Sequence, residues 1–289
     1  MPVDAAFPSQ ALRPGVKGAV SLVGAGPGDP ELLTVQAIKA IRRASVLLVD
    51  GLVGEGVLRY ARRSARVIHV GKRGGCASTP QAFIHKLMIA EARRGETVVR
   101  LKGGDPFIFG RGGEEAEHLR AAGIEVRIVN GITSGLAAAT ALGVPWTHRE
   151  HAHGVLLITG HAGEPNSELH WSTLAAAVAQ RLTLVVYMGV QRLGHIQNGL
   201  LAVLGADTPA ALVQHASTPQ ERRLVTTLGR LVADARHAGI ASPAILIVGD
   251  VLKGVQVVRA TAERNTAHCG AGQAGKPVRG WASKRAPSR

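Results

Sequence analysis

Cysteine, aromatic residues and long apolar runs are all scarce in this sequence, and each scarcity argues against a class of protein. Two cysteines, Cys76 and Cys269, cannot build a disulfide framework, so we expect reduced thiols and a cytoplasmic protein. No apolar run approaches the roughly 18 residues of a transmembrane helix, and the N-terminus lacks a signal peptide's apolar core, so we expect no membrane partner. Aromatic residues make up only 3% of the chain, which argues against a nucleic-acid partner.

Metal-ligand spacing is also missing. The chain has 12 histidines, but His148, His151 and His153 stand without cysteine or a paired-carboxylate spacing. We therefore interpret them as surface or polar-network residues and expect no metal site.

Positive charge, by contrast, is abundant. The net charge is +14, and residues 254–289 hold seven Lys or Arg against one acid, which leaves +8 on the body of the chain. The tail is rich in Gly, Ala, Arg and Lys and poor in large apolar groups, so we expect it to be disordered. A basic cleft in the body would favour an anionic ligand.

Residues 101–115, LKGGDPFIFGRGGEE, form the most informative stretch. They follow a β-branched run that predicts a buried strand and lead into an acidic helix start. Loops between a strand and a helix usually run about 2–6 residues, and packing alone does not require five glycines here. Glycine lets the backbone approach a ligand and exposes N–H donors, so we interpret this stretch as a binding loop.

The first half of the chain alternates between strand and helix patterns. Polar or glycine-rich residues follow each strand, and open parallel sheets bind ligands at that edge. The alternation predicts a doubly wound α/β domain. Strands are expected at 19–23, 45–49, 66–70, 97–101 and 125–129. Helices are expected at 31–43, at 80–94 with Ser78 or Thr79 as the cap, and at 113–122, and a last helix of small residues runs from the loop at 130–135 to 142.

Residues 24–29 resemble the glycine loop of a dinucleotide-binding unit, with Asp50 about 20 residues further on. The third glycine of that motif would fall at Asp29, and Pro27 and Pro30 stiffen the turn. An acid there would repel a pyrophosphate. We therefore expect a ligand loop lined by backbone, and not a phosphate cradle.

A second series of elements follows a break at 143–150. Its closing segments are short and separated by turns, which predicts a mixed sheet. Strands are expected at 154–159, 182–188, 210–215, 222–226 and 244–248, with helices from 172, at 191–204 and at 228–238. The expected division is an irregular leader at 1–16, an N-terminal α/β domain at 17–148, a C-terminal α/β domain at 149–253 and a basic tail at 254–289.

Taken together, these motifs resemble those of the uroporphyrinogen-III C-methyltransferases, a domain that also forms the C-terminal half of siroheme synthase. The similarity covers roughly residues 17–253 and is carried by 20–29, 71–73, 101–115, 131–134, 147–149 and 187–189. It implies two α/β domains with the active site in the cleft between them, and a homodimer. It also implies transfer of two methyl groups from S-adenosylmethionine to C2 and C7 of uroporphyrinogen III. The product is precorrin-2, formed via precorrin-1, for siroheme or cobalamin synthesis, with S-adenosylhomocysteine as by-product.

The methyl donor carries a sulfonium, an amino-acid group and adenosine, but no phosphate. Glycine backbone, a hydroxyl or two and an apolar slot suit those groups. A methionine after an apolar strand is usually core filler, yet its strand-end position and the resemblance favour Met188 as a donor contact. At 215–216, the backbone of Ala216 is favoured over the His215 side chain. The donor-binding residues that the resemblance implies are Pro27, Gly28, Gly103, Gly104, Asp105, Ile108, Thr133, Ser134, Met188 and Ala216.

The acceptor carries eight carboxylates, which the planar fork of arginine can bind in pairs. Candidate contacts at strand ends and loops are Arg73, Lys102, Arg111 and Arg149, although most Lys and Arg of the chain are solvated surface cations. The resemblance implies Asp50 as the catalytic general base, and Lys72 is the matching candidate acid. Asp50 could instead cap the next turn, and Lys72 could pair with a substrate carboxylate.

The chain departs from the family pattern at Gly51, Asn130, Trp146 and Glu150-His151. Competing functions are another tetrapyrrole (precorrin) methyltransferase of the same fold, diphthine synthase, a ribosomal-RNA methyltransferase, a nicotinamide-dependent oxidoreductase and a nucleic-acid binder. Residues 101–115 argue against the other methyltransferases. Pro27 and Asp29 argue against a nicotinamide site.

Overall fold

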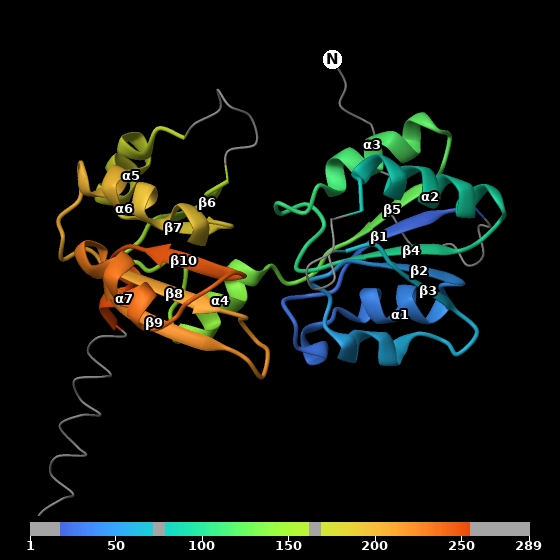
Figure 1. The fold of residues 1–289 in the computed structure, drawn as a ribbon, viewed down its shortest axis with the longest axis horizontal. Helices are drawn as coiled ribbons and strands as arrows, with labels where there is room; N and C mark the ends of the chain where they lie inside the picture. Colours follow the sequence, from blue (N-terminus) through green and yellow to red (C-terminus); the bar gives the residue numbers. More distant parts are fainter. Residues whose placement is uncertain (1–17, 72–78, 162–168, 255–289) are drawn as a thin grey trace, which may run out of the picture.

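The structure is a computed structural model that describes residues 18–71, 79–161 and 169–254. These ranges form two lobes that lie side by side, each built on one sheet (Figure 1). The expected leader, the basic tail after residue 254, Lys72, Arg73 and the proposed helix cap Ser78 lie outside the described residues.

The sheet of the first lobe is parallel throughout, as the alternating pattern predicted. Its five strands stand in the order β3-β2-β4-β1-β5. Strand β4 is central, between β2 and β1, and its two faces pack into the apolar clusters on either side of the sheet, so every residue in it is buried. The strands are β1 (Val20–Gly24), β2 (Val46–Val49), β3 (Arg66–His69), β4 (Val98–Lys102) and β5 (Val126–Val129).

Helices cover both faces of this sheet. One face packs on α1 (Val35–Arg43) and the 3-10 helix η2 (Glu55–Tyr60), and the other packs on α2 (Gln81–Arg93) and α3 (Gly112–Ala121). The helix expected at 31–43 is split into η1 (Pro30–Leu32) and α1, because Thr34 adopts extended backbone and caps Ala37 N–H at 3.1 Å. The cap predicted at Thr79 was wrong, since α2 begins after Pro80 with no side-chain cap.

The sheet of the second lobe is mixed, which confirms the expectation for this half. Its order is β6-β7-β10-β8-β9, with β6 parallel to β7 and the other neighbours antiparallel. The strands are β6 (Gly154–Thr159), β7 (Leu182–Tyr187), β8 (Pro209–Gln214), β9 (Arg222–Thr227) and β10 (Ala244–Val248). One face carries α5 (Trp171–Ala179), α6 (Leu193–Leu201) and α7 (Leu231–His237), and η3 (Val190–Arg192), η4 (Leu228–Arg230) and η5 (Asp250–Leu252) occupy the connections.

Helix α4 (Ser134–Leu142) corrects one expectation. It was read as the last helix of the first α/β series, but it packs on β7 and β10 of the second sheet, where Ala137, Ala138 and Ala139 are buried. The chain therefore crosses to the second lobe directly after β5. The predicted domain boundary at 148/149 stays a prediction.

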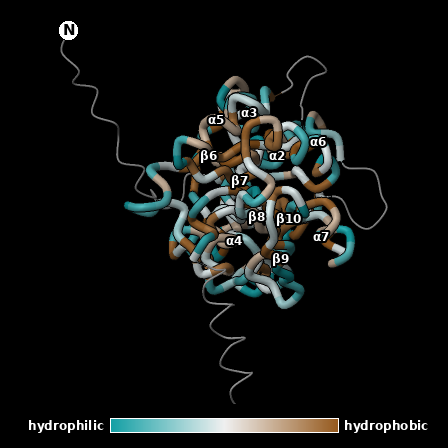
Figure 2. The backbone as a smooth tube through the Cα atoms, turned by 90° about the vertical axis from the view of Figure 1, so that its left-hand side faces the viewer, coloured by the Kyte–Doolittle hydropathy of each residue, from teal (hydrophilic) through white to brown (hydrophobic). Residues whose placement is uncertain are grey.

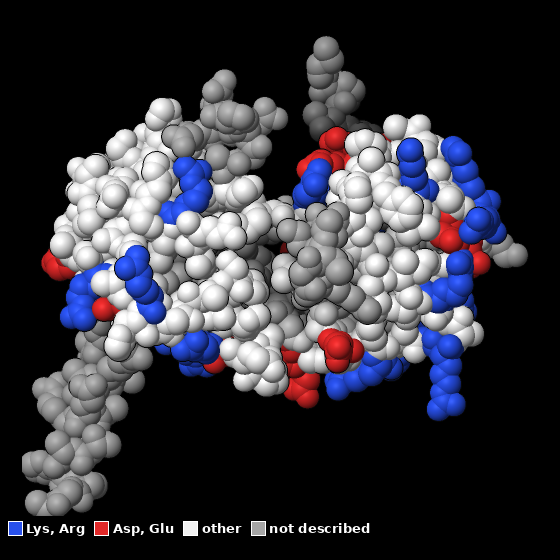
Figure 3. Space-filling view, viewed as in Figure 1, with Lys and Arg blue, Asp and Glu red and all other residues white. Residues whose placement is uncertain are grey.

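In the end-on view of Figure 2 polar segments lie mostly at the periphery, and each lobe has its own buried apolar clusters. Lys and Arg side chains are scattered over both lobes on the face in Figure 3 and do not gather into one basic patch there. Among the described helices, none is long and apolar enough to cross a membrane.

Candidate active site

Three glycine loops meet at the carboxyl edge of the first sheet. Gly26 and Gly104 exchange backbone hydrogen bonds, with Gly104 N–H to Gly26 C=O at 2.7 Å and Gly26 N–H to Gly104 C=O at 3.2 Å. A Cβ on Gly24 would lie 2.5 Å from the nitrogen of Gly131 in the loop after β5. These glycines are therefore needed for loop-to-loop packing, in addition to any approach to a ligand.

The Asp105 carboxylate holds two of these loops together. Its Oδ1 accepts Phe107 N–H at 2.8 Å, and its Oδ2 accepts Gly131 N–H at 3.0 Å and the Asn130 amide at 3.1 Å. Asp105 is 7% exposed. A donor contact at Asp105 would therefore use its backbone. Asn130, which departs from the family pattern, has a clear role here as a hydrogen-bond donor.

Non-glycine residues with left-handed backbone gather at the same place. Among the described residues, all of them except Arg181 lie in loops at the carboxyl ends of β4, β7 and β8. Each such residue costs about 1–2 kcal/mol, and strain of this kind concentrates at functional sites. They are Phe109 (φ 51°), Arg111 (58°), Met188 (54°), His215 (49°) and Ser217 (65°).

Contacts between the lobes bring these loops together. Asp29 N–H donates to the Ser217 hydroxyl at 3.2 Å, and the Phe109 ring lies 4.8 Å from the Tyr187 ring. The hydroxyls of Thr133 and Tyr187 are 2.8 Å apart, and burial raises the pKa of Tyr187. Residues from both halves of the sequence thus border one cleft.

Several predicted donor residues lie along this cleft. Met188 is 54% exposed, which is unusual for core filler, and Ala216 is buried directly before Ser217. The nearest atoms to a Cβ built on Gly104 belong to Thr133 and Ser134, at 3.7 Å. Ile108 packs against the core of the second lobe, and a Cβ on Gly28 would collide with Thr218 of the second lobe. Pro27 and Gly103 are half-buried in the same loops.

Two hollows open beside these loops. One of about 360 Å³ lies between the lobes and is mostly apolar, with Leu32 on one side and Ile132, Leu136 and Ser217 on the other. The second, of about 390 Å³, is bordered by Phe107, Arg111 and Glu114 at the start of α3.

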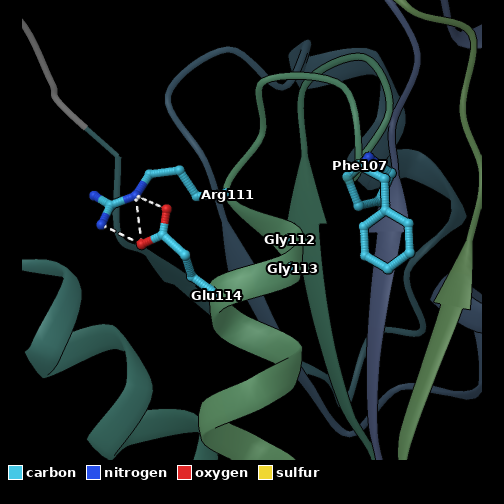
Figure 4. A pocket seen from close by; sticks show the side chains of 6 residues that line it. Phe107, Arg111, Gly112, Gly113 and Glu114 are labelled. Carbon is cyan, nitrogen blue, oxygen red and sulfur yellow. Dashed lines mark hydrogen bonds and ion pairs between the residues drawn. The ribbon is translucent and has the colours of Figure 1, made fainter. Parts of the chain in front are cut away.

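Arg111 is not a free cation in this hollow. Figure 4 shows its guanidinium and the Glu114 carboxylate turned toward each other, with Nη2–Oε2 at 2.6 Å and Nε–Oε1 at 3.1 Å. This hydrogen bonding raises the pKa of Arg111 and lowers the pKa of Glu114. Both side chains are about half exposed, at 55% and 51%. A carboxylate ligand would therefore have to share Arg111 with Glu114.

Lys102 corrects another expectation. It was expected to face the cleft, but it is 3% exposed, and its Nζ donates to Glu115 Oε1 at 3.0 Å. Burial lowers the pKa of Lys102, and the neighbouring charge of Arg100 lowers it further. This geometry leaves Lys102 no surface for a direct contact with a large acceptor.

Asp50 lies at the end of β2, as predicted. Its Oδ1 accepts Gly51 N–H at 3.0 Å, so it makes the local turn bond that was the alternative to catalysis, and its Oδ2 lies 3.8 Å from Arg100 Nη2. Its side chain is 34% exposed, which leaves both roles open. A Cβ on Gly71, the residue before Lys72, would collide with the backbone of Gly51, so the chain leading to Lys72 passes directly beside Asp50.

Arg149 is exposed in a tight turn that ends in a bridge between His148 and Ala152. The same turn brings ligand atoms of His148, Glu150 and His151 within 4.8 Å of one another, a grouping that sequence spacing did not suggest. The His148 and His151 rings stack at 4.6 Å, and His148 Nδ1 accepts Glu150 N–H. The expectation of no metal site stays a prediction.

Sequence reasoning missed four residues of this region. Ser217 and the Tyr187 hydroxyl carried no signal apart from their position at strand ends. Arg100 and Glu115 carried a stronger one: a cation inside a buried strand requires an anionic partner, and helix α3 supplies it.

Comparison with known proteins gives matches over most of the chain. The family described as Tetrapyrrole (Corrin/Porphyrin) Methylases matches residues 19–232. A uroporphyrinogen-III C-methyltransferase of Pseudomonas aeruginosa is 52% identical over 241 residues, which are 83% of this chain and 96% of the relative. A siroheme synthase of Azotobacter vinelandii is 46% identical over 83% of this chain, which spans only 51% of that protein. The crystal structure of a uroporphyrin-III C-methyl transferase from Thermus thermophilus, complexed with S-adenyl homocysteine, aligns with a TM-score of 0.68 at 41% identity, covering 81% of this chain and 99% of that one.

Proposed function

The chain belongs to the tetrapyrrole (corrin/porphyrin) methylase family, and on that premise we propose that it is an S-adenosylmethionine-dependent C-methyltransferase acting on uroporphyrinogen III. The finer proposal is methylation at C2 and then C7, giving precorrin-2 through precorrin-1, for siroheme or cobalamin synthesis. The observation that carries the proposal is the meeting of glycine loops from one lobe with strained strand ends from the other.

The cleft suits the methyl donor chemically. The donor supplies an electrophilic methyl carbon on a sulfonium and has no phosphate to bind. Backbone groups of Gly28, Gly103, Gly104 and Ala216 would hold its amino-acid and ribose groups, with Thr133 as a hydroxyl partner. The apolar wall of Ile132 and Leu136 offers a surface for a flat, weakly polar ring, and the exposed Met188 side chain is a further candidate contact.

The acceptor would lie toward the exposed arginines. Arg111 and Arg149 are both exposed, and guanidinium groups recognise carboxylates in two parallel hydrogen bonds. Arg73 stays a candidate from the sequence. Lys102 is buried against Glu115 and would not contact the acceptor itself.

The chemical step needs alignment and proton removal. An electron-rich pyrrole carbon attacks the methyl carbon as the bond from that carbon to sulfur breaks. This carbon becomes saturated and the ring cationic; the neighbouring meso carbon then loses its proton, and the electrons of that C–H bond form a double bond to the ring and neutralise the charge. In this proposal Asp50 accepts the proton, because its carboxylate lies at the strand end that borders the cleft and is partly exposed.

The test is an anaerobic assay of purified protein with uroporphyrinogen III and S-adenosylmethionine, with the products read by mass spectrometry. Because each methyl group added is matched by one hydrogen lost, we expect successive products heavier by one and by two CH2 units. If uroporphyrinogen III shows no mass change but a precorrin is methylated, the protein is a methyltransferase with a different acceptor. Thermal stabilisation by NADH and not by S-adenosylmethionine would refute a methyl-donor site.

The homodimer expected from the resemblance belongs to the same proposal. Light scattering of the purified protein measures it directly, and a mass equal to one chain would exclude it.

A further inference from the structure

Strand β4 carries two cations on a face that should be apolar. Side chains alternate along a strand, so Arg100 and Lys102 point to the same side as Val98, which packs under α2 and α3. Arg100 is 2% exposed and Lys102 is 3% exposed. A buried cation is expensive unless an anion and hydrogen bonds compensate it, so both require partners.

Glu115 of α3 is the common partner and has no exposed surface. Its Oε1 accepts from Gln81 Nε2 at 2.8 Å, from Lys102 Nζ at 3.0 Å and from Arg100 Nε at 3.3 Å. Gln81 and Lys102 would already satisfy this oxygen, and the charge of Lys102 alone balances the carboxylate, whose Oε2 has no hydrogen-bond partner among the described residues. Arg100 is therefore not needed merely to neutralise Glu115.

The other two nitrogens of Arg100 point toward the candidate base. Nη1 donates to Leu101 C=O at 3.1 Å, and the same carbonyl accepts Asp50 N–H at 3.1 Å. Nη2 lies 3.8 Å from Asp50 Oδ2. The guanidinium thus forms a long ion pair with the Asp50 side chain, beyond hydrogen-bond distance, and reaches the Asp50 backbone through the shared Leu101 carbonyl. Gly51 N–H holds the other carboxylate oxygen at 3.0 Å.

We propose that Arg100 is a positioning residue that fixes the orientation of the Asp50 carboxylate, with Glu115 holding Arg100 in place. This inference rests on the role proposed for Asp50. Only the planar fork of arginine can serve Glu115, Leu101 C=O and Asp50 at once; the single ammonium of lysine cannot span all three. When the meso proton moves to Asp50, the carboxylate becomes a neutral acid, and Arg100 stays protonated and keeps the group in place.

The test is a double-mutant cycle under single-turnover conditions with wild type, Asp50→Asn, Arg100→Met and the double variant. Asp50→Asn should slow turnover by about 10²–10⁴-fold, the usual contribution of a general base. Arg100→Met should slow it by about 10–100-fold, as for a misplaced catalytic group, with donor affinity unchanged. In the Asp50→Asn background, Arg100→Met should change the rate by less than about 3-fold, because the group it positions is already disabled.

Three further measurements separate positioning from structural damage. With acceptor deuterated at the meso carbons, Arg100→Met should show a larger isotope effect than wild type, since proton removal becomes slower; a smaller folded fraction would not change that ratio. Arg100→Lys keeps the buried charge and should recover part of the rate. Arg66→Met removes a guanidinium that pairs with Glu91 at the sheet edge, and should leave turnover at the wild-type rate.

Equal losses from Arg100→Met in both backgrounds would overturn the positioning role. If Arg100→Met does not fold, the same cycle is read with Arg100→Lys and with Arg100→Met/Lys102→Met/Glu115→Gln, which removes all three buried charges. A wild-type rate in Asp50→Asn would remove the base itself, and the inference with it. Absence of any methylated product from wild type would refute the proposed function instead, so the failures are distinguishable.

Discussion

Replacing Glu115 with leucine should unfold this protein at a much lower temperature. The carboxylate is fully buried and accepts three hydrogen bonds, two of them from cations. Without it, Arg100 and Lys102 stay buried beside each other with no anion between them. Removing one partner of a buried ion pair typically costs about 3–5 kcal/mol.

The size of the effect can be converted to a melting temperature. For a domain of about 150–250 residues, 1 kcal/mol corresponds to roughly 2–4 °C, so Glu115→Leu should lower the melting temperature by about 6–20 °C. The measurements are calorimetry and urea unfolding at neutral pH and moderate salt. Because the network is buried, raising the salt concentration should change the difference little.

A second substitution makes the reasoning refutable. Burial already lowers the pKa of Lys102, so its charge is costly when Glu115 is gone. Glu115→Leu/Lys102→Met removes both charges and should recover about 1–3 kcal/mol relative to Glu115→Leu, because an apolar replacement for a buried pair is often near neutral. A Glu115→Leu variant within about 1 kcal/mol of wild type would show that this carboxylate does not compensate the two cations.

Three further substitutions, at His85, Gly104 and Tyr187, should have smaller effects. Burial and the adjacent His118 lower the pKa of His85 below 6.5, so the unfolded chain binds a proton at this position more readily than the folded chain. This group should leave the stability unchanged above about pH 6.5 and lower it as the pH falls below that value. His85→Gln should therefore flatten the fall in melting temperature between about pH 8 and 5, and an unchanged slope would exclude the His85–His118 pair as its source. Gly104→Ala should lower the free energy of unfolding by about 1–2 kcal/mol, because Gly104 has φ +67°. Gly113→Ala lies in open space on α3 and should be neutral or stabilising by up to about 1 kcal/mol. Equal effects of the two variants in urea unfolding would contradict the role of backbone conformation. Tyr187→Phe removes the hydroxyl bonded to Thr133 and should lower the free energy of unfolding by about 0.5–1.5 kcal/mol. It should also weaken the binding of S-adenosylmethionine measured by calorimetry. An unchanged affinity would show that this hydroxyl pair lies outside the donor site.

Short-range sequence patterns were enough to predict the elements and the edge where the site lies. Runs of β-branched residues located the strands to within one or two positions, as in Val98–Lys102 against the expected 97–101. Alternation with helices predicted a parallel first sheet, and the carboxyl ends of parallel strands meet at one edge by geometry alone. Glycine density likewise pointed to the loops that close this edge.

The partners of charged side chains could not be predicted in the same way. Lys102 and Arg111 look equivalent in the sequence as cations of one loop, yet one is buried against Glu115 and the other is exposed beside Glu114. The difference depends on which face of β4 lies under α3, which involves a helix that packs back onto the strand. Local periodicity carries no information about that docking.

The sequence by itself determined where the backbone can turn tightly and which strand ends carry functional groups, because glycine, proline and β-branched residues act within a few bonds of themselves. Only the tertiary structure decided that α4 crosses to the second lobe, that Ser217 and Tyr187 meet the loops of the first, and that Arg100 reaches Asp50. These contacts join residues far apart in the chain or on different strands. They form because burying apolar faces brings the elements together, and the buried charges must then find partners within the packed arrangement.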